Sequence, residues 1–374
     1  MRERYNIGID AHAIGLRQGG NETYVYGLLN GLSQIEHPDF KYIVFLSEGI
    51  PVPEFLLKNK CFSFATVSPS AALRFIVDIP RKTYTEGLNL LHTQYHLPII
   101  SRCPGIITLH DVSFLRYPEF FPKKLYWQLK LSLLYSIRKS KKIITVSEFS
   151  KREIIKFYDV EQDKVDVIYN GVSENFRPVG QEDKEKILKK YGIKNPYILS
   201  VSNLQPRKNL SRLIKAFSSL VKNNEKFSYD LVIVGRKLWL CSEIFNEIRE
   251  ANIQERIILT GYVPEEDLVY LYNFAEVFVY PSLYEGFGLP IVEAMACGCP
   301  VITSSVSSLP EVAGKAGIMV NPYDVEEILQ AINGIIDNPD LKRNLKIEGL
   351  KQSQKFSWKS AAEKTLKVYE SVLC

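Results

Sequence analysis

The sequence predicts an α/β protein with two domains, each built on a parallel sheet that is covered by helices. With 374 residues, 46% of them apolar, the chain is about twice as long as a typical single domain. Short β-branched runs alternate with amphipathic stretches along the whole chain, which is typical of doubly wound parallel sheets. A highly charged segment without a strand pattern, within residues 175–195, divides this alternation into two series.

Short runs rich in β-branched and aromatic residues are the predicted strands. In the first series they are Tyr5–Asp10, Tyr42–Leu46, Leu88–Leu91, Ile106–Leu109, Ile143–Val146 and Val165–Tyr169. In the second series they are Tyr197–Val201, Leu231–Gly235, Ile257–Thr260, Val277–Tyr280 and Val301–Thr303.

The position of the charged segment predicts the domain boundaries. The expected domains are residues 1–178 and 179–357, joined by a hinge within 175–195. The amphipathic stretch 358–374 has no strand after it, and we expect it to pack back on the first domain. Ligands of such sheets bind at the carboxyl ends of the strands, so we expect the ligand in a cleft between the domains.

Composition argues against several classes of protein. The six cysteines are scattered without a C-x-x-C pair, which fits neither a zinc site nor a disulfide framework, and we expect no metal and no cofactor. No apolar run is long enough to span a membrane, and Met1–Asp10 is charged rather than apolar. We therefore expect a cytoplasmic protein.

The net charge of +5 arises entirely within residues 1–180. Much of it comes from residues 122–142, where lysines and arginines are interspersed with Leu, Tyr and Trp and no acidic residue occurs. This pattern predicts a basic amphipathic helix, a surface that an anionic membrane attracts. The alternative is a solvated face on an ordinary packed helix. Nothing in the sequence predicts binding to nucleic acid.

The strongest motif is Glu285-Gly-Phe-Gly-Leu-Pro-Ile-Val-Glu293, which follows the predicted strand Val277–Tyr280. Two glycines and a proline keep Glu285 on a loop and place Glu293 in the first turns of a helix that starts near Pro290. The backbone amides of residues 286–289 would then suit a diphosphate, while the two carboxylates accept hydrogen bonds from sugar and ribose hydroxyls. A purely structural turn with two capping acids is the alternative.

Arg207 and Lys208 form a second motif, in a loop between the predicted strand Tyr197–Val201 and a helix that starts near Asn209. Two fixed cations can stabilise a departing diphosphate without a metal. A solvated basic pair is the alternative, but the dipole at a helix start disfavours cations.

The motif at Glu285 resembles the paired-glutamate motif of the retaining glycosyltransferases of group 1, or family 4. Other segments match the same family in the same order: Val146–Ser150, Asn170–Val172, Ser202–Leu210 and Thr260–Pro264. Together they cover nearly the whole chain. The chain therefore resembles bacterial polysaccharide mannosyl- and glucosyltransferases of the GT-B fold, in which two Rossmann-like domains face an interdomain cleft.

The resemblance implies roles for the residues at matching positions. His110, which follows the strand Ile106–Leu109, would contact the donor sugar, although a histidine there is more often structural; Asp111 would order its loop. The catalytic set would be His110, Arg207, Lys208 and Glu285. The donor-binding set would be Gly19, Gly20, Asn203, Gly261, Tyr262, Val263, Gly286, Phe287, Gly288, Leu289 and Glu293. For Arg17, contact with an anionic acceptor and simple exposure both stay open.

The predicted reaction is metal-independent transfer of a hexose from a nucleotide sugar, UDP-glucose or GDP-mannose, to a saccharide or lipid-linked saccharide. Retention of configuration is implied by the resemblance alone. Two rivals remain: a non-hydrolysing nucleotide-sugar epimerase, and a catalytically silent protein that binds nucleotide sugars. The lack of a clean G-x-G-x-x-G disfavours a nicotinamide enzyme.

Overall fold

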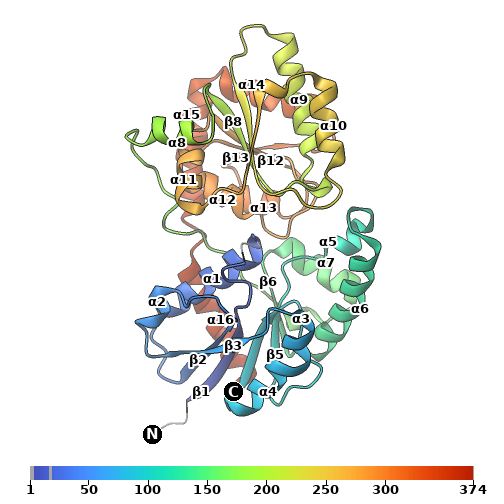
Figure 1. Ribbon diagram of the computed structural model, residues 1–374, viewed down its shortest axis with the longest axis vertical. Coiled ribbons are helices and arrows are strands. Elements are labelled where there is room, and N and C mark those ends of the chain that lie inside the picture. The colour runs from blue at the N-terminus through green and yellow to red at the C-terminus, as the bar shows by residue number, and fades with distance from the viewer. Residues whose placement is uncertain (1–3, 17–18, 374) are drawn as a thin grey trace. The chain divides into compact units, whose positions relative to one another are not determined.

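A computed structural model describes residues 4–16 and 19–373 and divides the chain into two compact units. Unit 1 comprises residues 1–115, 123–171 and 357–374, and unit 2 comprises residues 116–122 and 172–356. Each unit contains one sheet, and every strand pairing in both sheets is parallel. The two-sheet α/β expectation is therefore confirmed (Figure 1).

The sheet of unit 1 has the order β3-β2-β1-β4-β5-β6-β7. Its strands are β1 (Tyr5–Asp10), β2 (Phe40–Ser47), β3 (Phe62–Val67), β4 (Leu90–Gln94), β5 (Gly105–Thr108), β6 (Lys142–Thr145) and β7 (Val165–Val167). Its helices are α1 (Gly20–Ser33), α2 (Glu54–Leu57), α3 (Ala71–Leu73), η1 (Arg74–Asp78), α4 (Ile79–Thr85), α6 (Lys123–Lys139), α7 (Glu148–Tyr158), η3 (Gln162–Lys164) and α16 (Trp358–Leu373). Helix α5 (Ser113–Arg116) ends at the border of the unit.

The sheet of unit 2 has the order β10-β9-β8-β11-β12-β13. Its strands are β8 (Tyr197–Val201), β9 (Asp230–Val234), β10 (Ile257–Gly261), β11 (Val277–Tyr280), β12 (Val301–Ser304) and β13 (Gly317–Val320). Its helices are η2 (Pro118–Phe120), α8 (Lys184–Lys190), η4 (Pro206–Lys208), α9 (Leu210–Asn223), α10 (Ser242–Ala251), η5 (Gln254–Arg256), α11 (Glu265–Phe274), α12 (Leu289–Ala296), α13 (Leu309–Ala313), α14 (Val325–Ile336) and α15 (Pro339–Ser353).

In both sheets the chain starts at a central strand, builds outward to one edge, and then returns to build toward the other edge. The return places β4 beside β1 in unit 1 and β11 beside β8 in unit 2. The loops that follow such a pair diverge, because their chains continue in opposite directions across the sheet. This divergence opens a crevice at the carboxyl edge of the strands, where ligands of open α/β sheets bind.

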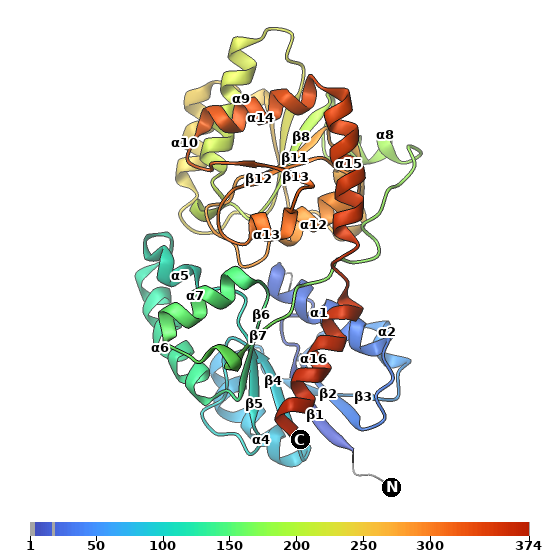
Figure 2. The same cartoon turned by 180° about the vertical axis from the view of Figure 1, so that it is seen from behind.

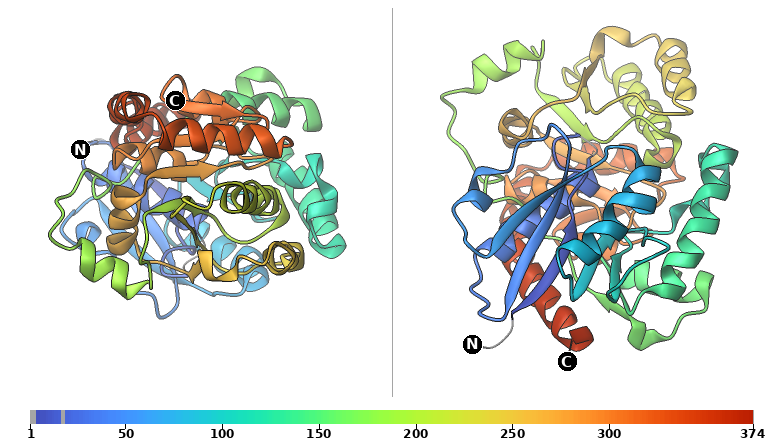
Figure 3. Two further views of the ribbon diagram at one scale, coloured as in Figure 1. Left: turned by 90° about the horizontal axis from the view of Figure 1, so that it is seen from above. Right: turned by 60° about the horizontal axis from the view of Figure 1, so that its bottom comes forward.

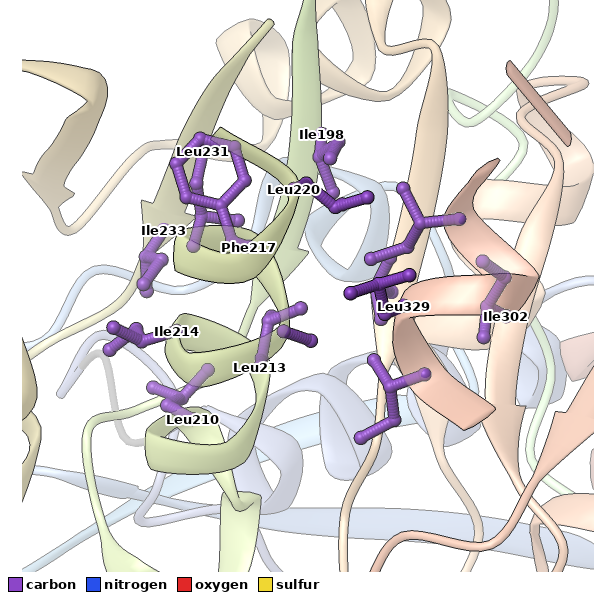
Figure 4. Packing of buried hydrophobic residues seen from close by; sticks show 14 of the residues in the cluster. Ile198, Leu210, Leu213, Ile214, Phe217, Leu220, Leu231, Ile233, Ile302 and Leu329 are labelled. Atoms are coloured by element: carbon purple, nitrogen blue, oxygen red, sulfur yellow. The ribbon is translucent and has the colours of Figure 1, made fainter. Parts of the chain in front are cut away.

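The core of unit 2 shows why these segments form helices and strands. Helix α9 carries buried apolar residues at helical spacing, among them Leu210, Leu213 and Phe217. They pack against strand residues such as Ile198 and against α14 (Figure 4). Most strand positions are buried, so the strands are apolar almost throughout, as expected of parallel strands covered on both faces.

The charged segment expected to be a hinge packs within unit 2. Ser173 Oγ and Asn175 Nδ2 both donate to Glu265 of α11 at 2.8 Å, and Val179 N donates to Asn273 Oδ1 at 2.9 Å. Lys190 Nζ and Tyr191 OH bind Asp267 of the same helix. The chain passes between the units at 115–116, 122–123, 171–172 and 356–357.

Helix α16 packs on α1 within unit 1, as Figures 2 and 3 show. Trp358, its first residue, lies in a notch bordered by three glycines. A Cβ on Gly27 would come within 2.0 Å of the Trp358 ring, and on Gly31 within 2.2 Å of the Trp358 carbonyl oxygen. A Cβ on Gly171 would come within 2.1 Å of the Trp358 nitrogen. The close approach of the two helices therefore depends on these glycines.

Among the described residues, no helix has the length and apolarity needed to cross a membrane.

We predict that Gly31→Ala destabilises unit 1 by about 1–3 kcal/mol, because the added methyl meets main-chain atoms that cannot move aside by rotation. Thermal unfolding, with hydrogen exchange of α1 and α16 amides, measures the effect. Gly334→Ala on α14 is the matched control, since nothing lies within 4 Å of its new methyl. The control should be neutral or stabilising by ~0.4–1 kcal/mol, and equal stability of the two variants would contradict the close-approach argument.

Candidate active site

The expected cationic pair and the first carboxylate of the paired-glutamate motif lie on the loops that diverge in unit 2. Arg207 and Lys208 belong to η4, after β8, and Glu285 follows β11. Because β8 and β11 are neighbours in the sheet, these loops start side by side at its carboxyl edge. In such sheets the ligand crevice forms at this place. The strand order thus brings together residues that are far apart in the sequence.

Glu285 binds both cations directly. Lys208 Nζ donates to Glu285 Oε1 at 2.6 Å, and Arg207 Nη1 donates to Glu285 Oε2 at 2.8 Å. Tyr280 OH donates to the same Oε1 at 2.9 Å and accepts from Lys208 Nζ at 2.7 Å. Charge-assisted bonds of this length are the stronger kind of hydrogen bond, so the four side chains form one fixed cluster.

Main-chain contacts hold the two loops together beneath this cluster. Leu283 N donates to Arg207 O at 2.9 Å, and Arg207 Nη1 also donates to Tyr284 O at 2.8 Å. Asn209 adopts a left-handed conformation with φ 59° and donates through Nδ2 to Pro281 O at 2.9 Å. Arg207 is therefore held by the backbone of the Glu285 loop as well as by its carboxylate.

The ion pairs determine the charge of Glu285. Burial alone raises the pKa of this carboxyl, but Arg207, Lys208 and the hydrogen bonds to the carboxylate outweigh burial and lower the pKa to about 2. Glu285 is only 6% exposed, so its negative charge is compensated by the protein rather than by water. With two cations and one carboxylate, the cluster carries one net positive charge.

A third loop fixes the backbone after Glu285. Ser308 Oγ donates to Glu285 O at 2.9 Å and to Phe287 O at 3.1 Å. Gly288 has φ 101°, a conformation that favours glycine, and α12 starts at the next residue, Leu289. The expected helix start near Pro290 is therefore correct, while anion binding by the amides of 286–289 stays a prediction.

Glu293 lies on α12 in a different environment. Tyr272 OH donates to its Oε2 at 2.9 Å, and burial raises its pKa to about 7. The two carboxylates of the motif therefore differ: the cations keep Glu285 ionised, whereas burial leaves Glu293 about half protonated at pH 7.

The predicted donor-binding residues Asn203 and Gly261–Val263 lie on the loops after β8 and at the end of β10. Arg236, after β9, joins them: its backbone N donates to Asn203 Oδ1 at 3.1 Å, and its guanidinium lies 4.9 Å from the Tyr262 ring centroid. Gly235 permits this approach, because a Cβ there would meet Ser202 O at 2.0 Å. The sequence prediction did not include Arg236 in the donor-binding set, although its position after a strand was a usable signal for its proximity to Asn203 and Tyr262.

A cavity within unit 2 borders the same loops. It measures about 300 Å³ and is lined by residues that include Gln205, Pro206, Leu283, Arg212 and Tyr323. Its volume is at the lower end of the range of about 300–1,000 Å³ typical of small-molecule sites. The loop that carries Arg207 thus lies beside space of ligand size.

In unit 1, His110 follows β5 and is enclosed by polar and aromatic neighbours. Its Nε2 lies 2.8 Å from Gln94 Oε1, and its ring centroid lies 4.7 Å from that of Tyr24 and 5.5 Å from that of Tyr95. Burial lowers the pKa of His110 to about 4, although Asp111 opposes this shift, so the imidazole is neutral at pH 7. Asp111 Oδ1 accepts from Ser113 N at 2.9 Å, which confirms its loop-ordering role.

The glycine loop of unit 1 leads into α1. Gly19 has φ 70° and precedes the helix, which starts at Gly20. Arg17 lies outside the described residues. No group of three or more His, Cys, Asp or Glu side chains that could hold a metal occurs in the described part of the chain.

Residues 183–352 match the family described as glycosyl transferases group 1, and residues 18–176 match glycosyltransferase family 4. The chain is 36% identical over 267 residues to O-antigen chain mannosyltransferase B of Escherichia coli, which covers 71% of this chain and 70% of that protein. This chain belongs to the group 1, family 4 glycosyltransferases.

Other proteins similar to this glycosyltransferase agree with the assignment. O-antigen chain mannosyltransferase RfbU of Salmonella typhimurium is 31% identical over 272 residues, which cover 72% of this chain and 69% of that protein. The structure of Anabaena HepE in complex with UDP-glucose matches with a TM-score of 0.77 over 98% of this chain and 99% of that chain, at 19% identity. The predicted family and GT-B fold are therefore confirmed.

We predict that Glu285 makes this glycosyltransferase less stable in acid. Its pKa of about 2 in the folded state lies below the ordinary 4.5, so its contribution is present above pH 4.5 and is lost as the pH falls through 2. The loss amounts to ~3 kcal/mol. Urea unfolding at a series of pH values measures it, and Glu285→Gln should flatten the dependence in this window.

Glu293→Gln is the contrasting variant. Because the folded pKa of Glu293 is about 7, above the ordinary 4.5, its contribution is present below pH 4.5 and is lost as the pH rises through 7. This variant should change the dependence between pH 4.5 and 7 and leave the acid window unchanged. The same slope in both variants between pH 2 and 4.5 would contradict the assignment.

Proposed function

We propose that this glycosyltransferase transfers a hexose, with retention of configuration and without a metal, from a nucleoside diphosphate sugar to a saccharide or lipid-linked saccharide in polysaccharide synthesis. The observation that carries the proposal is the Arg207–Glu285–Lys208 cluster at the diverging loops of unit 2. Its net positive charge lies where a nucleoside diphosphate would need compensation as it departs.

The proposed step uses the leaving group as its own base. The bond between the anomeric carbon and the β-phosphate oxygen breaks, the acceptor oxygen bonds to the anomeric carbon on the same face, and the acceptor proton passes to the departing phosphate oxygen. Arg207 and Lys208 stabilise the charge that develops on the diphosphate. Glu293 and the Asn203–Tyr262 group are proposed to bind the nucleoside, and His110 to contact sugar hydroxyls.

Mannose is the proposed sugar, with GDP-mannose as the first donor to test. Support comes from two relatives at 36% and 31% identity that are both described as O-antigen chain mannosyltransferases. UDP-glucose is the second candidate, because the HepE structure that shares this fold holds it. Incubation of enzyme with donor alone separates transfer from epimerisation, since an epimerase changes the donor without any acceptor.

We predict that Arg207→Ala lowers kcat by about 100- to 1,000-fold, the cost typical of removing one preorganised charge. Lys208 remains to pair with Glu285 in this variant, so the fold should survive. Replacing both cations should abolish transfer, but it would leave Glu285 buried without a cationic partner and so destabilise the protein. The single variant is therefore the cleaner test.

Radiolabelled-donor transfer to an oligosaccharide acceptor measures this effect, and thermal shift with GDP, UDP and their sugars measures donor binding. Lys215→Ala on α9 is the matched control, because it removes an exposed cation of the same unit, which pairs with Glu247 at 3.0 Å. Wild-type turnover in Arg207→Ala, or no stabilisation by any nucleotide, would refute the proposal.

We also propose that unit 1 contacts anionic lipid through α6. Trp127, Leu131 and Tyr135 are spaced by one helical turn and are 55%, 66% and 38% exposed. Ile99 and Ile100 extend this surface with 69% and 73% exposure, and Tyr135 OH donates to Ile99 O at 2.8 Å. Lysines border it, and Lys130 lies over the Trp127 ring. Exposed apolar side chains bordered by lysines suit the face of an anionic bilayer that lies toward the cytoplasm.

We predict that the protein floats with vesicles of phosphatidylcholine and phosphatidylglycerol but not with phosphatidylcholine alone, and that salt weakens the association. Leu131→Asp should reduce partitioning ~10-fold or more, because it removes apolar area that would enter the bilayer and adds a negative charge that the anionic lipid repels. Ile347→Asp, at an exposed position of α15, is the matched control. Equal flotation of the two variants would assign α6 to an ordinary solvated surface.

A further inference from the structure

The side chain of Gln94 bridges His110 and the first turn of α1. Gln94 is the last residue of β4 and is only 6% exposed. Its Oε1 lies 2.8 Å from His110 Nε2, and its Nε2 donates to Asn21 O at 3.1 Å. Asn21 follows Gly19 and Gly20 directly, so one buried amide connects the end of these predicted donor-binding glycines with the predicted sugar-contacting histidine.

The Asn21 carbonyl determines which end of the amide faces the histidine. A carbonyl oxygen can only accept a hydrogen bond, so the Gln94 NH₂ group must point toward Asn21. The reversed amide would place two acceptor oxygens 3.1 Å apart with no hydrogen between them, which is unfavourable. The Oε1 atom of Gln94 therefore faces His110.

The orientation of the amide in turn determines the position of the histidine proton. Oε1 has no hydrogen to donate, so the bond to His110 requires a proton on Nε2. Burial keeps the imidazole neutral at pH 7, because it lowers the pKa of His110 to about 4. A neutral imidazole carries one proton only, and Nδ1 is consequently an acceptor.

Neighbouring rings limit any rotation of the imidazole. Tyr24 packs edge-on against His110, and its OH lies 2.7 Å from Thr108 Oγ1, a fully buried atom pair. Thr108 Oγ1 is also 2.8 Å from His92 Nε2. Tyr95, with φ 64°, lies against the imidazole at a tilt. The ring orientation is thus set by packing and the proton position by Gln94.

We propose that Gln94 is a positioning residue that holds His110 in the tautomer protonated on Nε2, so that Nδ1 accepts a hydrogen bond from a hydroxyl of the donor sugar. The part that concerns the sugar rests on the proposed function. The tautomer itself does not, and it is measurable in the protein without ligand.

Long-range proton–nitrogen correlation spectra of protein labelled with ¹⁵N-histidine report the tautomer of each of the five histidines. His110→Phe identifies the His110 signals. In the wild type we expect the shift of a protonated nitrogen at Nε2 and of a bare nitrogen at Nδ1. A proton on Nδ1 instead would overturn the proposal.

Gln94→Leu removes the acceptor and should move the two nitrogen shifts of His110 toward each other. Gln330→Leu, at an exposed position of α14, is the matched control and should leave them unchanged. Gln94→Glu loses the donor to Asn21 O but retains an acceptor for His110, and it should keep the proton on Nε2; a thermal melt of each variant checks that it is folded. Wild-type shifts in Gln94→Leu, or loss of the Nε2 proton in Gln94→Glu, would show that Gln94 does not set the tautomer.

Transfer assays then test the consequence for the sugar. Gln94→Leu should lower kcat/KM roughly 10- to 100-fold, as expected when a contacting group is misplaced, with the affinity for free nucleotide unchanged. In a His110→Ala background the same change should cost much less, because the loss that acts through His110 has already occurred and only the bond to Asn21 O remains to be removed. Additive losses would overturn this role, whereas absence of any transfer in the wild type would refute the proposed function and leave the tautomer result standing.

Discussion

Glu285 is a buried carboxylate whose ionised form depends on two cations from a different loop. The strand order and the turns of unit 2 bring these cations close to it. Burying one charge costs several kcal/mol unless a partner of opposite sign is fixed close by. Lys208 and Arg207 are close only because β11 returns to pair with β8. The ion cluster thus depends on the strand order, on the left-handed turn at Asn209 and on Ser308, which follows β12.

The two units share a strand order but carry different chemistry at the divergence of their central loops. In unit 2 the side chains there are charged and compensate one another. In unit 1 the hydrogen-bonded group around His110 is neutral, since it consists of His110, Gln94 and Tyr24, while Asp10 at the end of β1 is paired with Arg74. Charges suit phosphate oxygens, whereas a neutral imidazole and amide suit hydroxyl groups, which donate and accept singly. The division agrees with separate recognition of diphosphate and sugar.

The sequence predicted those parts of the fold that depend on local pattern. Strands β1, β8 and β11 have the predicted bounds, and most positions of each are buried. Strand β3 was missed because most of its positions are only partly buried, and β13 because it is short and starts at Gly317. The ion pairs of Glu285 and the Gln94 bridge could not be foreseen, since each joins loops whose proximity depends on strand order rather than on spacing in the sequence.

The cluster around Glu285 also bears on how the proposed reaction turns over. An arriving diphosphate would compete with Glu285 for Arg207 and Lys208. Its net binding free energy would therefore be reduced by the cost of breaking the hydrogen bonds that Glu285 already forms. When the nucleoside diphosphate leaves, Glu285 can form its ion pairs with both cations again. Two cations without Glu285 would bind the product more tightly and release it more slowly. A carboxylate alone would repel a phosphate. Its position beside a phosphate site is nevertheless consistent with an enzyme that must release its nucleoside diphosphate product.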